Sequence, residues 1–153
     1  MADAVLNPEP IVKALHGAFC HDTPRQDLLQ RAATKIREAG SPYTGVYMYM
    51  LHGDTLELEA FAGRPTDHTT IPIGTGICGR AVAEMQDLNV PNVKEAGGYL
   101  ACSIETKSEL VVLIRRHDEI LGQIDVDSDM VDGFNTEEER ATREIADALA
   151  SLL

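Results

Sequence analysis

The sequence predicts an α+β domain in which an antiparallel sheet of about six strands carries the N- and C-terminal helices on one face. Three observations support this fold class: helical periodicity at both ends of the chain, strand periodicity in the middle, and hairpin-type turns between strands. Short turns make neighbouring strands antiparallel, and the terminal helices then cover one face of the sheet. The other face is left for a ligand pocket or for loops.

A first helix is expected near the N-terminus, because apolar residues recur there at helical spacing. Ile11, Leu15 and Phe19 fall on one stripe of this helix. Cys20 continues the stripe, so we expect its thiol to pack in the core.

A second helix is predicted to begin after residue 23. Thr23 is suited to the N-cap, Pro24 to the first helical position, and Gln26 to closing a capping box. Gly40 is suited to ending the helix. Its apolar face consists of Leu28, Leu29, Ala32 and Ile36.

The middle of the chain is predicted to form strands. Residues 43–51 and 55–61 alternate in side-chain character, and His-Gly-Asp at 52–54 is a good hairpin signal between them. A short strand is expected at 70–73. A glycine-rich bend follows it at 74–79.

The next segment is expected to contain a brief helix over 79–86 and a short strand around 88–90. A long loop, rich in small and polar residues, then covers 93–108. Loops of this length in compact domains are usually functional.

A second hairpin joins residues 109–116 to 120–128 through 117–119. A strand directs successive side chains to opposite faces of its sheet. One face of the second strand therefore carries Ile120, Gly122, Ile124 and Val126, and the other carries Gln123, Asp125 and Asp127.

The last helix is predicted to run from Thr136 to Leu153. Thr136 and Glu139 have the spacing of a capping box. The apolar face of this helix consists of Ala141, Ile145, Ala148, Leu149 and Leu152.

Composition favours one soluble domain over residues 1–153, which we expect in the cytoplasm. The content of 44% hydrophobic and 25% charged residues is ordinary for such a domain. No apolar run approaches the roughly 18 residues of a membrane helix, and the N-terminus lacks the features of a signal peptide. The net charge of −12 repels phosphate backbones, which excludes nucleic acid as a partner.

Two of the three cysteines are candidates for redox chemistry. Cys78 follows two glycines at a helix start, where the helix dipole favours a thiolate. Cys102 lies in the long loop, where we expect access to solvent. Both a reactive thiol and a buried, inert side chain remain open for each. The five histidines lack the paired spacing of a zinc site, so we expect no metal.

Asp125, Asp127 and Asp129 alternate along the chain as calcium ligands do. The EF-hand pattern fails, because Met130 stands where glycine is needed and Thr136 where a bidentate Glu belongs. The acids therefore form either a solvated sheet face or the floor of a pocket that binds a cation.

From about residue 43 onward the chain resembles the GAF-domain free methionine-(R)-sulfoxide reductases. The resemblance is carried by Gly76-Ile-Cys78-Gly79, Leu100-Ala-Cys102, Ser108-Glu109-Leu-Val and Gly122-Gln-Ile-Asp125-Val-Asp127-Ser128. These motifs combine both cysteines with three acids, which sensory GAF domains do not. The resemblance implies a single GAF-like domain.

The resemblance also implies an activity. Members of the family reduce the R epimer of free methionine sulfoxide with a thiol, need no cofactor, are recycled by thioredoxin and commonly form dimers. Cys102 corresponds to their catalytic cysteine. The residues that correspond to their substrate-binding groups are Glu109, Asp125, Asp127, Tyr47 and, in place of a pocket tryptophan, Tyr43.

One departure from the family concerns recycling of the thiol. His68 stands where a third cysteine usually provides the resolving thiol, so Cys78 is expected to form a disulfide with Cys102 instead. The same departure leaves an alternative function open. In that alternative, the chain is a non-catalytic GAF sensor that binds a small amino-acid-like ligand.

Overall fold

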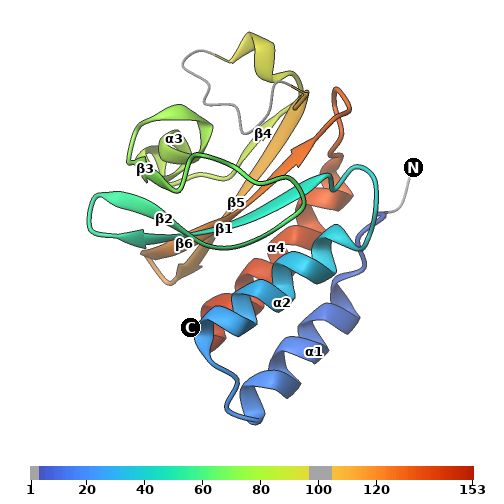
Figure 1. Cartoon of the computed structure of the whole chain (residues 1–153), viewed down its shortest axis with the longest axis vertical. Helices are drawn as coiled ribbons and strands as arrows, with labels where there is room; N and C mark the ends of the chain where they lie inside the picture. Colours follow the sequence, from blue (N-terminus) through green and yellow to red (C-terminus); the bar gives the residue numbers. More distant parts are fainter. Residues whose placement is uncertain (1–3, 97–104) are drawn as a thin grey trace.

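The computed structural model describes residues 4–96 and 105–153. Two helices lie on one face of a central sheet with a third packed against them, while a fourth lies on the opposite side of the sheet (Figure 1). The predicted fold class is therefore confirmed. The helices are α1 (Pro8–Cys20), α2 (Arg25–Arg37), α3 (Gly76–Glu84) and α4 (Thr136–Leu152), with a 3-10 turn η1 (Val93–Glu95).

The sheet has six strands in the order β3-β2-β1-β6-β5-β4, and all described neighbours are antiparallel. Because β6 pairs with β1, the last hairpin occupies the centre of the sheet rather than its edge. The strands are β1 (Gly45–His52), β2 (Thr55–Ala62), β3 (Thr70–Pro72), β4 (Leu88–Val90), β5 (Ser108–Arg116) and β6 (Glu119–Ser128).

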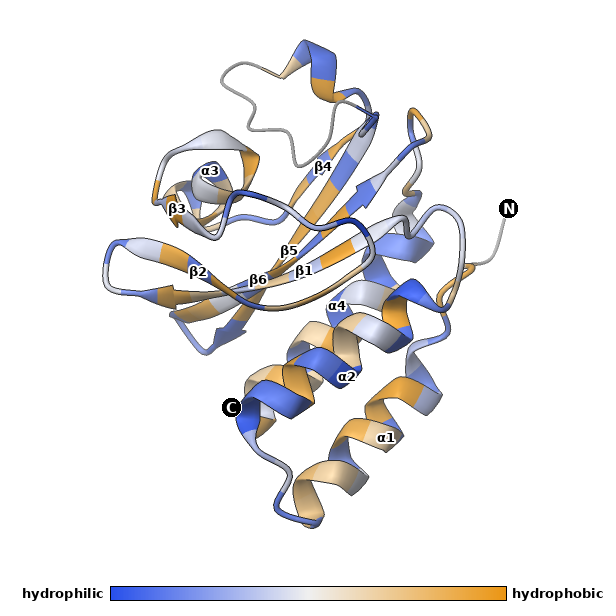
Figure 2. Cartoon of the chain, in the orientation of Figure 1, coloured by the Kyte–Doolittle hydropathy of each residue, from blue (hydrophilic) through white to orange (hydrophobic). Residues whose placement is uncertain are grey.

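Both faces of the sheet are covered, so the fold has two apolar clusters. The larger cluster lies between the sheet and α1, α2 and α4. The smaller one lies under α3 and includes Tyr47, Tyr49 and Cys78. The central strands are accordingly largely hydrophobic in Figure 2. None of the helices in the described ranges is long and apolar enough to cross a membrane.

The contacts of α1 differ from the prediction. Its buried stripe is Ile11, Leu15 and Ala18, whereas Phe19 is 47% exposed and Cys20 is exposed. Successive helical residues point about 100° apart, so a helix that buries Ala18 turns Phe19 away from the core. The prediction that Cys20 packs in the core is therefore wrong.

Two helix starts also differ from the prediction. Asn135 rather than Thr136 caps α4, with its side-chain oxygen accepting a hydrogen bond from the Glu138 N–H at 2.9 Å. Thr23 does not cap α2, because the helix begins one residue later than predicted, after Pro24, and has no side-chain cap. The Thr23 N–H donates to the Ala18 carbonyl and closes the turn after α1. Asn and Thr are both good capping residues, and the path of the preceding chain decides which is used.

The alternation of β6 is confirmed where it matters for the site. Ile124 and Val126 pack toward the large helices, and Asp125 faces the α3 side. A register irregularity between Ile114 and Arg115 of β5 reverses the alternation near the hairpin turn. Ile120 therefore packs on the α3 side, contrary to the prediction.

Replacing Gly122 by Ala is expected to destabilise the protein by about 1–3 kcal/mol, the usual cost of overpacking. A Cβ at this position would lie 2.3 Å from the Tyr49 carbonyl oxygen, and a backbone atom in a sheet cannot move aside cheaply. The matched control is Gly17→Ala in α1, where a Cβ meets nothing within 4 Å. This control should gain about 0.5–1 kcal/mol from helix propensity. Urea unfolding measures both, and equal stability of the two variants would contradict the assigned packing.

Candidate functional site

Three chemically active side chains converge on the α3 side of the sheet. Cys78 comes from the first turn of α3, Glu109 from β5 and Asp125 from β6. One ligand atom from each lies within 4.8 Å of the others, and all three residues are buried. Cys78 Sγ lies 3.6 Å from Glu109 Oε2 and donates a hydrogen bond to it.

Strand register explains why acids distant in sequence meet. Glu109 of β5 is directly opposite Asp127 of β6, and Val111 is opposite Asp125. Glu109 and Asp125 are therefore diagonal neighbours on one face of an antiparallel pair, where side chains are within reach of each other. Glu109 and Asp125 line one cavity, as predicted, whereas Asp127 is paired with Glu109 but is not among the described residues that line the cavity. The roles of all three acids stay a prediction.

The glycine-rich bend brings Cys78 onto the sheet. Gly74 and Gly76 adopt positive φ angles of 91° and 64°, a backbone conformation that favours glycine. At Gly79 a Cβ would lie 2.5 Å from the Pro72 carbonyl oxygen, so only glycine permits this close approach of α3 to β3. Gln123 of β6 donates a hydrogen bond to the Cys78 carbonyl at 3.1 Å and so holds the first turn of α3 on the sheet.

Burial and crowding of like charges govern protonation in this cluster. Glu109 is 2% exposed and Asp125 is fully buried. Burial, followed by the charges of Asp125 and Asp127, raises the pKa of Glu109 well above its ordinary value of 4.5. Burial also raises the pKa of Asp125, an effect that proximity to Glu109 and Cys78 partly offsets. The upward shift is therefore the stronger one for Glu109, which favours its protonated form over that of Asp125.

The buried carboxylate of Asp125 has few contacts that would stabilise a negative charge. Glu109 and Cys78 lie close enough to influence its pKa, yet neither of its oxygens has a well-aligned hydrogen bond to any described residue. Asp127 accepts a long hydrogen bond from the Thr106 hydroxyl at 3.4 Å. A buried carboxylate in the position of Asp125, with neither oxygen in a well-aligned hydrogen bond to a described residue, is unusual in a folded protein and points to a ligand.

A small cavity lies at the cluster, with a solvent volume of about 10 Å³. A cavity of this volume has room for one water molecule or ion, so its walls must move apart before an amino-acid ligand can bind. The sequence pattern alone did not identify Tyr49 and His68 as pocket residues, because neither has a distinctive spacing. The lining residues are Tyr49, His68, Ile71, Thr75, Gly76, Ile77, Cys78, Glu109 and Asp125.

The two tyrosines assigned to the pocket lie on different sides of the sheet. Tyr47 pairs with Asp125 in the β1–β6 register and belongs to the α3-side cluster, where its ring stacks on Phe61. Tyr43 lies in the helix-side core, where its hydroxyl donates a 2.6 Å hydrogen bond to Glu138. Tyr43 precedes β1, so strand alternation does not extend to it. The prediction that Tyr43 lines the substrate pocket is therefore wrong.

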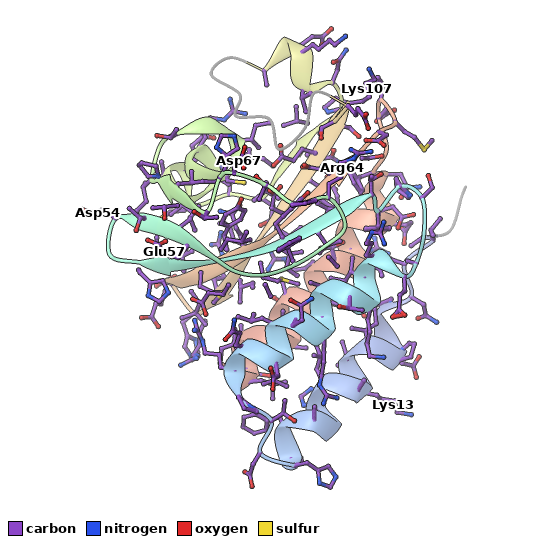
Figure 3. All side chains as sticks on the ribbon, in the orientation of Figure 1. Lys13, Asp54, Glu57, Arg64, Asp67 and Lys107 are labelled. Atoms are coloured by element: carbon purple, nitrogen blue, oxygen red, sulfur yellow. The ribbon has the colours of Figure 1, made fainter. Side chains whose placement is uncertain are left out.

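A network of charges borders Tyr47. The Tyr47 hydroxyl donates to the Arg64 carbonyl at 2.7 Å, and the Arg64 guanidinium pairs with Asp129 and with Glu105, the latter at 2.9 Å. Arg64 lowers the pKa of Asp129, to which Lys107 also contributes. Arg64 and Lys107 lie toward the same end of the molecule in Figure 3.

Cys102, the predicted nucleophile, lies outside the described residues. Cys78 and Cys20 are both thiols, the first buried and the second exposed. Cys78 is therefore the described thiol that lies beside the acids.

Glu109→Gln is expected to flatten the dependence of stability on pH. Above about pH 4.5 the unfolded Glu109 ionises while the folded one keeps its proton, so the folded state binds more protons. The free energy of unfolding then falls as pH rises toward the folded-state pKa, and the glutamine removes that part of the fall. Thermal unfolding from about pH 5 to about pH 8 measures the slope. Glu84→Gln, at an exposed position of α3, should keep the wild-type slope; an unchanged slope in Glu109→Gln would contradict the protonated assignment.

Comparison with known proteins agrees with this arrangement. The GAF domain family matches residues 24–153. A free methionine-R-sulfoxide reductase of Escherichia coli (strain K12) is 33% identical over 126 residues, which is 82% of this chain and 72% of the relative. The chain belongs to the GAF-domain family of free methionine-R-sulfoxide reductases.

Solved structures of family members have the same fold as this GAF domain. The type II free methionine-R-sulfoxide reductase of Thermoplasma acidophilum has 39% identity and a TM-score of 0.81, covering 84% of this chain and 91% of its own. The enzyme of Neisseria meningitidis, solved in complex with its substrate, has 26% identity and a TM-score of 0.87, covering 99% and 91%.

Proposed function

We propose that the chain reduces free L-methionine (R)-S-oxide to methionine with a cysteine thiolate. The observation that carries this proposal is the buried group of Glu109, Asp125 and Asp127 beside the Cys78 thiol, in a chain of the reductase family. Residues 1–153 act as one GAF domain, in the cytoplasm and as a homodimer. The reaction uses the cysteine thiols of the chain, with thioredoxin as the electron donor, and needs no cofactor.

The acids would select a free amino acid by charge. Free methionine sulfoxide carries an ammonium group that a peptide-bound residue lacks, and Asp125 and Asp127 supply the opposite charge. Tyr47, on the strand beside Asp125, provides an apolar wall for the side chain of the substrate. The cavity is closed to a molecule of this size, so binding is expected to displace its walls.

Glu109 would act as the acid in the chemical step. The Cys102 thiolate attacks the sulfoxide sulfur, and the protonated Glu109 donates to the departing oxygen, a role for which its raised pKa suits it. The protonated oxygen passes to the Cys102 sulfur as its bond to the substrate sulfur breaks. The transient bond between the two sulfurs then breaks, and methionine leaves, reduced by two electrons. Cys102 is oxidised by two electrons and becomes a sulfenic acid.

Recycling would begin with a Cys78–Cys102 disulfide, formed when the Cys78 thiol condenses with the sulfenic acid and releases water. Thioredoxin then reduces this bond. Closing the span of 24 residues is worth about 3.5 kcal/mol in the chain-entropy model. Peptide mapping of sulfoxide-treated protein is expected to find this cross-link. A persistent sulfenic acid, or turnover with small thiols alone, would contradict the two-cysteine cycle.

A thioredoxin-coupled assay with both epimers of free methionine sulfoxide tests the proposed function. We expect turnover of the R epimer, little of the S epimer and none of a peptide-bound R sulfoxide. The second candidate is a sensor without turnover, which His68 at the position of the usual resolving cysteine favours. A chain that is silent with both epimers, yet thermally stabilised by methionine, would establish the sensor instead.

A further inference from the structure

We infer that Cys78, Glu109 and Asp125 form a binding site for a thiophilic divalent cation of the zinc class. Such an ion would occupy the site that the proposed reductase uses for its substrate and would inhibit the enzyme reversibly. The binding site stands on the geometry of the described residues alone, whereas the inhibition rests on the proposed function. The sequence left a cation pocket open for the acids of β6, but it did not assign Cys78 and Glu109 as ligands of a cation there, because the three ligands come from separate elements.

The spacing of the donor atoms fits tetrahedral coordination. Zinc binds thiolate at about 2.3 Å and carboxylate oxygen at about 2.0 Å, so two such ligands at the tetrahedral angle lie about 3.5 Å apart. Cys78 Sγ and Glu109 Oε2 are 3.6 Å apart. Asp125 completes a set of three donors that all lie within 4.8 Å of one another.

A second observation that points to a cation is the buried carboxylate of Asp125, which has neither a well-aligned hydrogen bond nor an ion pair with a described residue. Its two oxygens are fully buried, line the cavity and have no well-aligned hydrogen bond to a described residue. No Lys or Arg in the described ranges forms an ion pair with either Glu109 or Asp125. A divalent ion would supply both the missing charge and the missing ligand contact.

The donor set distinguishes between classes of metal. One thiolate with two carboxylates suits zinc and its soft neighbours, whereas magnesium and calcium require oxygen ligands throughout. The cavity of about 10 Å³ admits a single ion. Binding releases the Cys78 thiol proton and the Glu109 proton to solvent, since each ligand must be deprotonated.

Cadmium titration followed by the ultraviolet thiolate-to-metal absorption band tests binding without any need for turnover. The informative protein is the double variant Cys20→Ser/Cys102→Ser, in which Cys78 is the sole thiol. We expect one cadmium ion per chain, with the band present in this variant and absent in Cys78→Ser. Absence of the band in the sole-thiol variant, or its persistence in Cys78→Ser, would overturn the site.

The carboxylate ligands are tested with the thiol retained. In the sole-thiol background, Glu109→Gln and Asp125→Asn should each weaken cadmium binding at least about tenfold, in line with the loss of one ligand. Asp54→Asn, at the exposed tip of the β1–β2 hairpin, is the matched control and should bind as its parent does. Circular dichroism confirms folding of each variant. Equal affinity of all three variants would overturn the proposed ligand set.

Inhibition is tested separately in the wild-type chain. Free methionine sulfoxide should raise the apparent dissociation constant of cadmium, and zinc should inhibit turnover in a manner that a chelator reverses. Cadmium affinity that does not respond to the sulfoxide would overturn the competition and leave the ion site standing. A chain that binds cadmium through Cys78 and has no turnover would refute the proposed function alone.

Discussion

Cys102→Ser is expected to reduce turnover of free methionine (R)-sulfoxide by more than about 1,000-fold, because loss of a nucleophile removes the covalent route. The variant should also form no sulfenic acid on exposure to the sulfoxide, which a trapping reagent and mass spectrometry measure. Cys20→Ser is the matched control, since Cys20 is an exposed thiol on α1. It should keep wild-type activity.

Cys78→Ser distinguishes the two cysteine roles. This variant should complete a first turnover and form the sulfenic acid, then fail to recycle through thioredoxin. The opposite pattern, in which Cys102→Ser keeps turnover and Cys78→Ser loses the first step, would reverse the assignment.

Asp125→Asn and Asp127→Asn are each expected to raise the KM for free methionine sulfoxide by roughly 10- to 100-fold. A hydrogen bond between charged groups is worth about 1.5–3 kcal/mol, and each substitution removes the charge on one side of it. Stability should be unchanged or higher, because one of several crowded negative charges is lost. Steady-state kinetics and thermal unfolding measure the two effects. Asp54→Asn is the exposed control and should leave KM unchanged.

Glu109→Gln should affect kcat more than KM. Glutamine preserves the shape of the side chain but transfers no proton, and loss of a general acid typically costs about 10²–10⁴ in rate. A uniform rise in KM for Glu109→Gln, Asp125→Asn and Asp127→Asn, with kcat unchanged, would show that all three acids only bind the substrate.

The order of helices and strands follows from local sequence, and so does the face of β6 that carries the acids. Periodicity is a property of neighbouring residues, so Ile124 and Asp125 are assigned to opposite faces without knowledge of the fold. The second hairpin also implies that Glu109 lies near the end of β6 that carries the acids, whereas the exact pairing of Glu109 with Asp127 depends on the register irregularity between Ile114 and Arg115.

The tertiary structure decided which features become buried. An acidic sheet face is most simply a solvated one, and only the placement of α3 over the sheet makes Glu109 and Asp125 a buried pair. That placement depends on the approach of Gly79 to the Pro72 carbonyl, a contact between backbone segments that no periodicity reveals.

Local pattern was insufficient wherever an element ended. Tyr43 shares the odd numbering of Tyr47, yet it precedes β1 and packs against the helices. Cys20 follows apolar residues in the sequence, yet α1 buries Ala18 in its last turn and leaves the Cys20 thiol exposed. Side-chain direction follows a fixed period only within an element. The sequence thus determined the elements and their faces, whereas the packing of whole elements against each other determined the protonation and proximity of the site.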